Sequence, residues 1–564
     1  MRQDSERLRH RQPQFHMYRA ITIATLILVA FPSCNTNAPQ SPTPGAIPTQ
    51  MESTATATST VPPTLTATPQ PHRLPVQLGP NQRDFPTGTN PLTGLEVHDP
   101  SLLNLPAVLV SISNMPVTAR PQAGPAFAPW IFEFYIGEGS TRFMGVFYGD
   151  NLREIPNVTG GCKVREEIFY PTGSWVGNRI WLDENANGVQ ESWEAGVGGV
   201  CVRLLDANSR NVLSETTTDS NGYFAFDNPR VDAIIQIVKP DSYQFTLQNI
   251  GDEDSDSDAD AEGEIKVPAG ESTLPYFDAG LVLHEIPTMT ASPVVTGTPP
   301  NWFFPFEPYI GPVRSGRLTY NQIGGMFPNS CLVYASAAED IGEQLDACEI
   351  VYGVDKTTPN SALLTHTRLR ELAKEAFIPH QPVNYSGNIF SEALPEGGRA
   401  ANLIDVFYNS FTQSGWQYDP ISQTYLRWTD QADQTGNLFP ATDRLTGRQM
   451  AFENVIVLFA EHSRYRHNQL EILLGAGQKG LAYLFRDGQV FRIQWSTLNR
   501  EYEKTTGLLR PMYFVDSYNN PIALHPGRTW IHLVTPFSGV SDEGNGNWFV
   551  KFIQPLDLLD TPVP

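Results

Sequence analysis

The chain has 564 residues, which corresponds to three or four folded units at about 100 to 200 residues per domain. With 44 glycines added to the 40% hydrophobic fraction, about 48% of the residues are apolar, so wholesale disorder is excluded. The 38 basic and 60 acidic side chains give a net charge of −22. This charge argues against nucleic acid as a partner, because binding to phosphate backbones needs a basic surface.

Residues 1–34 are typical of an export signal. A mostly apolar run, 20–31, follows Arg19 and is too short to span a bilayer. Cys34 follows a small residue, as in the lipobox of bacterial lipoproteins, whereas Phe31 and Pro32 depart from that pattern. We expect a lipid on Cys34 that anchors the protein to the outer face of the bacterial cell membrane. A plain secreted form or an uncleaved form is the alternative.

Two segments, 35–80 and 284–304, are rich in Pro and Thr and poor in large apolar side chains. Such segments cannot offset the entropy of ordering, so they should remain extended and solvated. At roughly 3 Å per residue, the first segment would act as a stalk behind the anchor. A merely tolerated disordered tail is the alternative. The second segment marks a linker between domains.

Four cysteines remain beyond Cys34, in a compartment where disulfides persist. They are Cys162, Cys201, Cys331 and Cys348. Four cysteines allow three pairings, and the short spacing favours Cys331 with Cys348. The chain contains no Cys-x-x-Cys motif, which argues against a zinc ribbon.

The sharpest local signal is a twelve-residue calcium loop, 183–194. A hard cation needs six to eight oxygen ligands, and alternate side chains can surround it only where a glycine permits a sharp turn. Gly188 occupies that sixth position. A metal-free Asx-rich turn is the alternative. The predicted ligands are Asp183, Asn185, Asn187, the backbone carbonyl of Val189, Glu191 and Glu194.

Short strand-like segments, rather than amphipathic helices, surround this loop. They lie at 174–181, 199–205, 216–226, 233–238 and 277–282, and such spacing predicts a small β-sandwich. With its Asn-Gly-Tyr-Phe turn and its Asp-Ala-Gly-Leu end, segment 170–283 resembles an SdrD B-like domain, a relative of the B repeats of bacterial collagen adhesins. The resemblance implies that calcium stiffens a spacer.

This segment carries most of the negative charge of the chain. Residues 170–283 contain 20 acidic and 6 basic side chains, a net of −14. Self-repulsion of this size favours bound cations. The acidic run 251–264 either supplies a second calcium site or forms a solvated loop, and the sequence leaves both open.

The sequences on either side of the sandwich share a second resemblance. Asn90-Pro-Leu-Thr-Gly-Leu, Ala119-Arg-Pro-Gln-Ala-Gly and Thr141-Arg-Phe before it, and Gly311-Pro-Val-Arg-Ser after it, resemble the YerB family of bacterial lipoproteins, whose activity is unassigned. The resemblance continues through Asp443-Arg-Leu-Thr-Gly and His525-Pro-Gly-Arg-Thr-Trp. It implies a split N-terminal domain, 81–150 plus 305–399, and a C-terminal domain, 400–560, with the sandwich inserted into the first.

We therefore expect a multidomain α+β protein. Strand-like runs at 108–112, 131–136 and 142–147, with a helical pattern at 361–376, predict an α/β first domain. The β-sandwich interrupts this domain. Asp487-Gly488 between two strand-like runs predicts a hairpin, and the C-terminal domain should be mainly β.

Arginines in the YerB-like segments indicate a pocket for an anionic ligand, because guanidinium forks suit phosphate and carboxylate groups. A helix beginning near Ser315 would bring two of them to one side. Two glutamates, separated by a turn at Gly137 and Gly139, are expected to face them. Salt bridges that merely hold the domain together are the alternative. The residues are Arg120, Arg142, Arg314 and Arg317, with Glu133 and Glu138.

No Gly-x-Ser-x-Gly, His-Glu-x-x-His or Gly-x4-Gly-Lys-[Ser/Thr] motif is present. The leading hypothesis is a noncatalytic binding or scaffolding lipoprotein of the cell envelope, with an anionic wall polymer or a surface protein as its partner. The rival hypothesis is a hydrolase or transferase that uses Glu133 or Glu138 on an anionic envelope substrate.

Overall fold

The computed structural model describes residues 76–149, 162, 173–283, 308–353, 360–466 and 469–555. The predicted export signal, Cys34, most of the predicted stalk and the linker 284–304 lie outside the described residues. Among the described residues, no helix is long and apolar enough to cross a membrane.

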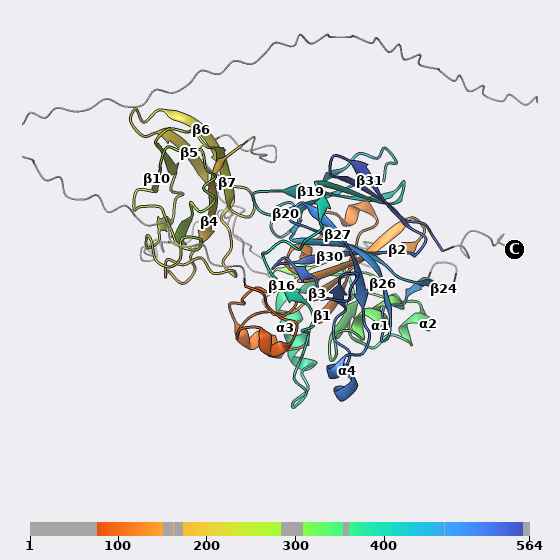
Figure 1. Ribbon diagram of the computed structural model, residues 1–564. Helices are drawn as coiled ribbons and strands as arrows, with labels where there is room; N and C mark the ends of the chain where they lie inside the picture. The colour runs from red at the N-terminus through yellow and green to blue at the C-terminus, as the bar shows by residue number, and fades with distance from the viewer. Residues whose placement is uncertain are drawn as a thin grey trace, which may run out of the picture. The chain divides into compact units, whose positions relative to one another are not determined.

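An eleven-stranded mixed sheet forms the centre of the body (Figure 1). Strands from both predicted YerB-like domains contribute to it, because β2 pairs in parallel with β30, with Trp130 opposite Thr529. A boundary near residue 400 therefore does not separate two sheets. The strand order is β14 (Ala347–Ile350), β13 (Cys331–Tyr334), β1 (Val108–Ser113), β3 (Ser140–Phe147), β2 (Trp130–Gly137), β30 (Thr529–Val534), β23 (Asn454–Phe459), β26 (Lys479–Arg486), β27 (Gln489–Ser496) and β17 (Arg399–Ala400), with β28 (Tyr513–Val515) also paired to β27.

A seven-stranded sheet packs on one face of this central sheet. Its order is β21 (Phe439–Pro440), β20 (Thr424–Thr429), β19 (Thr412–Asp419), β18 (Leu403–Asn409), β32 (Asn547–Lys551) and β31 (Gly539–Gly544), with β22 (Ala451–Phe452) paired to β20. Three two-stranded pairs complete the body. They are β12 (Tyr309–Ile310) with β15 (Leu364–Thr365), β16 (Ile389–Phe390) with β29 (Ala523–Leu524), and β24 (His462–Arg466) with β25 (Gln469–Ile472).

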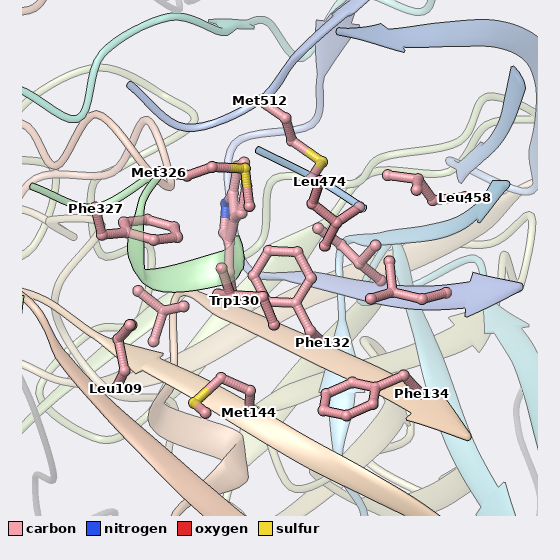
Figure 2. Packing of buried hydrophobic residues seen from close by; sticks show 14 of the residues in the cluster. Leu109, Trp130, Phe132, Phe134, Met144, Met326, Phe327, Leu458, Leu474 and Met512 are labelled. Atoms are coloured by element: carbon pink, nitrogen blue, oxygen red, sulfur yellow. The ribbon is translucent and has the colours of Figure 1, made fainter. Parts of the chain in front are cut away.

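The two faces of the central sheet belong to two different cores, because successive side chains of a strand point to opposite faces. On β2, Phe132 and Phe134 belong to the core shown in Figure 2, with Met144 of β3 and with Met326 and Phe327. The other core lies between the two sheets of the body and contains Ile131, Phe143 and Trp530 of the central sheet and Tyr408 and Trp416 of the seven-stranded sheet.

The inserted segment is a β-sandwich, as predicted, with a hydrophobic core of its own. One sheet has the order β10 (Glu264–Val267), β8 (Ala233–Ile237), β5 (Cys201–Asp206) and β6 (Val212–Thr217). The other has the order β7 (Tyr223–Asp227), β4 (Trp175–Leu182), β11 (Ala279–Leu283) and β9 (Tyr243–Phe245).

Helices are few and short in the described part of the chain, so the α/β architecture predicted for the first domain is not confirmed. The helix predicted at 361–376 is present as a shorter one, capped by the Thr365 side chain. The helix predicted near Ser315 begins only at Thr319, after an extended segment that pairs with β1. The helices are α1 (Thr319–Gly324), α2 (Glu339–Gly342), α3 (His366–Glu375) and α4 (Glu501–Thr506), with 3-10 turns at Gln82–Asp84, Pro100–Asn104, Val117–Ala119 and Pro125–Phe127.

The disulfide partners of the cysteines are Cys331 with Cys348 and Cys162 with Cys201. The first pair is the one that the sequence favoured, and its Cα atoms lie 5.5 Å apart on the adjacent strands β13 and β14. That pair therefore fastens the edge strand β14 to the central sheet.

One turn motif occurs twice in the body, in Asn90-Pro-Leu-Thr-Gly and in Asp443-Arg-Leu-Thr-Gly. In each copy the first side chain accepts a hydrogen bond from the backbone N–H two residues later, at 2.9 Å. The closing glycines, Gly94 and Gly447, have φ values of 71° and 65°, a conformation that favours glycine. These two YerB-like motifs are therefore structural.

Candidate functional site

The predicted calcium loop begins where β4 ends. Asp183, the first loop residue, is 1% exposed, and its backbone N–H donates to the Leu281 carbonyl of β11. The end of a paired strand therefore fixes the first carboxylate in place. Gly188, the sixth residue, has a φ of 82°, and a Cβ atom there would lie 2.9 Å from the Leu247 carbonyl oxygen. Both the turn and the close neighbour require glycine at this position.

Backbone donors of the loop orient its side-chain oxygens. The Asp183 carboxylate accepts from the N–H groups of Asn187 at 3.2 Å and Gly188 at 2.8 Å. The Glu194 carboxylate accepts from Glu184 at 2.9 Å and Glu191 at 3.2 Å. The first and last carboxylates thus draw the loop into a ring. The side-chain oxygens of Asn185 and Asn187 also accept loop N–H groups, at 3.0 and 2.7 Å.

Negative charge is concentrated in this ring. The pKa of Glu194 is raised to about 8. Burial is the main cause, the carboxylates of Glu191 and Asp183 add to it, and two backbone hydrogen bonds oppose it. Glu191 Oε2 is buried and has no hydrogen-bond partner in the part of the chain that the structure describes. An orphaned carboxylate oxygen beside other carboxylates is the environment that a bound cation relieves.

The oxygen chemistry of this loop fits calcium. Carboxylate, amide and carbonyl oxygens are hard ligands, and the loop holds no sulfur or imidazole that would favour a softer metal. No group of three or more His, Cys, Asp or Glu side chains converges as a metal cluster in any of the described ranges. The ligand set predicted for this loop combines carboxylate, amide and backbone carbonyl oxygens.

The acidic run 251–264 lies against this loop. Asp256 forms a backbone bridge with Val189, and its Oδ1 atom is buried without a hydrogen-bond partner. Burial, together with the negative charge of Asp256, raises the pKa of Asp258 to about 7. Buried Asp278 is held differently, by hydrogen bonds from the Arg179 backbone N–H and the Asn178 side chain at 3.0 Å. The run is thus partly buried, so a fully solvated loop does not describe it.

Glu133 lies on the face of β2 that points between the two sheets of the body. It is 0% exposed, and its carboxylate accepts from Thr141 Oγ1 at 2.9 Å and Trp530 Nε1 at 3.1 Å. Arg427, on β20, pairs with it at 3.3 Å and lies over the Trp530 ring at 4.6 Å. The Glu133 carboxylate is thus enclosed by protein groups, and a substrate cannot reach it.

Glu138 and Arg120 do not join an arginine pocket. Glu138 is exposed in the turn between β2 and β3, at a φ of 51°. Arg120 donates its Nε–H to the backbone carbonyl of Asn114 at 3.0 Å and lies 3.7 Å from the Asp430 carboxylate. Arg120 therefore links the central sheet to the seven-stranded sheet.

Three of the predicted arginines do come together, on the opposite face from Glu133. On β3, Arg142 stands beside Ser113 of β1 and Phe134 of β2. Arg314, in the extended segment that pairs with β1, donates its Nε–H to Ser113 Oγ at 3.0 Å. Burial, together with the nearby positive charges of Arg317 and Arg314, lowers the pKa of Arg142 to about 10. Alternation along β2 and β3 thus separates Glu133 from these arginines.

A cavity of about 680 Å³ lies elsewhere in the body and contains none of the predicted site residues. Phe85, Tyr148 and Tyr385 contribute aromatic walls, and proline, aliphatic, amide, hydroxyl and imidazole side chains line the remainder. No acidic, lysine or arginine side chain lines it. Its chemistry therefore differs from that of both charged sites.

Sequence reasoning missed the partners of Glu133. Arg427 is 1% exposed and His532 is 0% exposed, and both belong to strands of the C-terminal half. His532 Nδ1 lies 3.5 Å from Glu133 Oε2, and its Nε2 accepts from Trp416 Nε1 at 2.9 Å. Arg427 lies between the large apolar residues Leu426 and Trp428 of its strand, and this placement was the available signal.

Family comparisons agree with this architecture. Residues 174–281 match the model of the SdrD B-like domain. Residues 92–169 match the N-terminal domain, and residues 404–531 the C-terminal domain, of a protein family of unknown function, DUF3048. The chain carries an SdrD B-like domain between the two DUF3048 domains. The predicted insertion of an SdrD B-like domain into a second family's sequence is thereby confirmed.

Individual relatives overlap only part of the chain. The fibrinogen-binding protein of Staphylococcus epidermidis is 42% identical over 88 residues, which is 15% of this chain and 8% of that protein. Serine-aspartate repeat-containing protein D of Staphylococcus aureus strain Newman is 36% identical over 117 residues, 20% of this chain and 8% of that protein. This chain thus spans less than a tenth of either relative. The structure also aligns with the crystal structure of the YerB protein from Bacillus subtilis, at 16% identity and a TM-score of 0.41 over 79% of this chain and 96% of that chain.

Proposed function

We propose that this protein is an extracytoplasmic, lipid-anchored binding or scaffolding protein of the bacterial envelope, whose SdrD B-like domain is a calcium-stabilised spacer and whose DUF3048 domains form the binding body. Its partner is an anionic wall polymer or a surface protein. The observation that carries the proposal is the ring of oriented oxygens in the loop 183–194, closed by Asp183 and Glu194.

Calcium would be held by Asp183, Asn185, Asn187, the Val189 carbonyl, Glu191 and Glu194. When bound, the ion supplies positive charge that neutralises the crowded carboxylates and cross-links two ends of one loop. The residues themselves do no chemistry on a substrate. A ring fastened in this way resists local opening of the sandwich, which suits a spacer that must keep its length.

The extracytoplasmic location is supported by two further features of the chain. Its disulfides, Cys331–Cys348 and Cys162–Cys201, suit an oxidising compartment. The segment 1–34 has the pattern of an export signal that ends in a lipobox-like Cys34. Replacement of Cys34 by serine should release the protein from the membrane fraction, and retention there would contradict lipid anchoring at this cysteine.

Hydrogen exchange of the full chain, followed by mass spectrometry, tests the calcium proposal. Peptides that cover 183–194 should exchange at least about tenfold more slowly with calcium than with chelator, because the ion raises the cost of local opening. Asp183→Ala should remove this difference. Glu271→Gln, which removes an exposed negative charge of the same domain outside the loop, should keep it. Equal exchange of the unmodified protein under both conditions would refute the proposal.

A further inference from the structure

Three arginines lie near one another on one face of the central sheet. No described carboxylate is among the charges that act on one of them, Arg142. Only Tyr320 and the two positive neighbours, Arg317 and Arg314, contribute to its electrostatic environment in the described structure. Most of the arginines that pair in the body, such as Arg427 and Arg510, have a carboxylate within 3.3 Å. Arg142 differs from these paired arginines, and Arg142, Arg314 and Arg317 are called the arginine cluster below.

Arg142 has the most unusual environment of the three. It is 5% exposed, and two of its donors, Nε and Nη1, are buried without a hydrogen-bond partner in the described part of the molecule. A buried donor left unpaired destabilises the folded state, and more so when the group is charged. Such a group calls for a partner from outside the chain, and a bound anion is one that also supplies the missing charge.

The surroundings provide access and additional donors. Arg314, Ser315 and Arg317 are half-buried, so part of the 314–317 segment beside Arg142 reaches solvent. Arg317 Nη1 donates to Ser315 Oγ at 2.9 Å and to the Gly316 carbonyl at 2.8 Å, and these bonds hold its guanidinium in place. The Nε of Arg317 is a third buried donor that has no hydrogen-bond partner among the described residues.

We propose that Arg142, Arg314 and Arg317 form a binding site for the phosphoryl group of an exogenous ligand. A phosphoryl group presents several acceptor oxygens and up to two negative charges, which suits donors arriving from β3 and from the 314–317 segment. A single carboxylate would offer only two coplanar oxygens to these donors. The inference is independent of calcium, so Asp183→Ala should leave phosphoryl binding intact.

Isothermal titration calorimetry of the full chain with inorganic phosphate, at constant ionic strength, tests this site. The unmodified protein should bind saturably. Arg142→Met and Arg317→Met should each weaken binding by about 10- to 100-fold, since each removes charge-assisted hydrogen bonds. Arg317 is half-buried, so its replacement keeps the test valid if Arg142→Met does not fold. Arg368→Met is the matched control, because that arginine pairs with Glu349 and Glu375 on the surface, and it should bind like the unmodified protein.

Three further ligands define the class and its source. Binding of methyl phosphate but not dimethyl phosphate would assign the site to free phosphate or a terminal phosphoryl group. Binding of dimethyl phosphate as well would assign it to an internal phosphodiester, as in a phosphate-linked polymer. Either result supports the proposal. Absence of saturable phosphate binding, unchanged binding by both arginine variants, or equal affinity for acetate would overturn it.

Discussion

Replacement of Arg142 by methionine should make the folded protein more stable in phosphate-free buffer. Methionine keeps an unbranched side chain of similar length but removes a buried charge whose Nε and Nη1 donors have no partner among the described residues. A structural arginine should give the opposite result, because its removal would break bonds. The direction of the change therefore separates a site built for a ligand from a site built for the fold.

The environment of Arg142 sets the expected magnitude. Burial lowers the pKa of this guanidinium from its ordinary value to about 10. At pH 7 the group is charged in both the folded and unfolded chains, so the whole penalty is present, and it disappears only as the pH rises from about 10 through the ordinary pKa of arginine. At about 1.4 kcal/mol per pKa unit, the difference corresponds to about 3 kcal/mol. Lost packing offsets part of this, and we expect a gain of about 1 to 3 kcal/mol.

Urea denaturation at pH 7 measures the change as a higher midpoint with an unaltered slope. Added phosphate should stabilise the unmodified protein, by about 2.7 kcal/mol at one hundred times its dissociation constant, and should leave Arg142→Met unaffected. Arg427→Met is a matched control, since Arg427 is paired with buried Glu133, and its loss should cost about 3 to 5 kcal/mol. Destabilisation of both variants to a similar extent would refute the reasoning.

Three other outcomes follow from the structure. Burial lowers the pKa of His532 to about 4, aided by the positive charge of Arg427 and opposed by the negative charge of Glu133. The free energy of unfolding should therefore fall by about 3 kcal/mol as the pH falls from 6.5 to 4. His532→Gln should reduce this pH dependence, measured by urea denaturation at each pH. The Cys331–Cys348 disulfide joins residues 17 apart in sequence, and its reduction should lower the free energy of unfolding by about 3 kcal/mol. The urea midpoint with and without reductant measures this change. An unchanged midpoint would show that the disulfide does not stabilise β14. Gly188 has a φ of 82°, so Gly188→Ala should destabilise the sandwich by about 1 to 3 kcal/mol. It should also reduce the difference in hydrogen exchange between the calcium-bound and calcium-free protein. Calcium-dependent protection equal to that of the unmodified protein would contradict the assigned turn.

Local features were predictable because neighbouring residues determine them. The Asp487-Gly488 hairpin joins β26 and β27 as expected, with φ values of 50° and 66° that this dipeptide tolerates. The loop 183–194 also has many hydrogen bonds between its own residues, although Asp183 is held in addition by Leu281, and calcium binding by this loop stays a prediction. The resemblance of the surrounding sequence added the sandwich.

Contacts between distant segments were not predictable in the same way. Glu133 and Arg427 pair across 294 residues, and nothing in the sequence near Glu133 specifies which strand will face it. The same holds for the pairing of β2 with β30, which joins the two DUF3048 segments into one sheet. The predicted α/β architecture of the first domain is not confirmed, since the described helices are short and the sheet takes its remaining strands from the C-terminal half.

The two charged clusters of the body differ because they occupy opposite faces of β2 and β3. Glu133 faces the layer between the sheets, where Arg427 compensates its charge and Trp530 and Thr141 satisfy its oxygens. Arg142 faces the other side, where no described carboxylate compensates it. A fold gains nothing from an uncompensated buried cation, whereas a binding site does, because the ligand then supplies both the missing charge and the missing acceptors. The face with the unbalanced charge is therefore the one to which we assign the ligand.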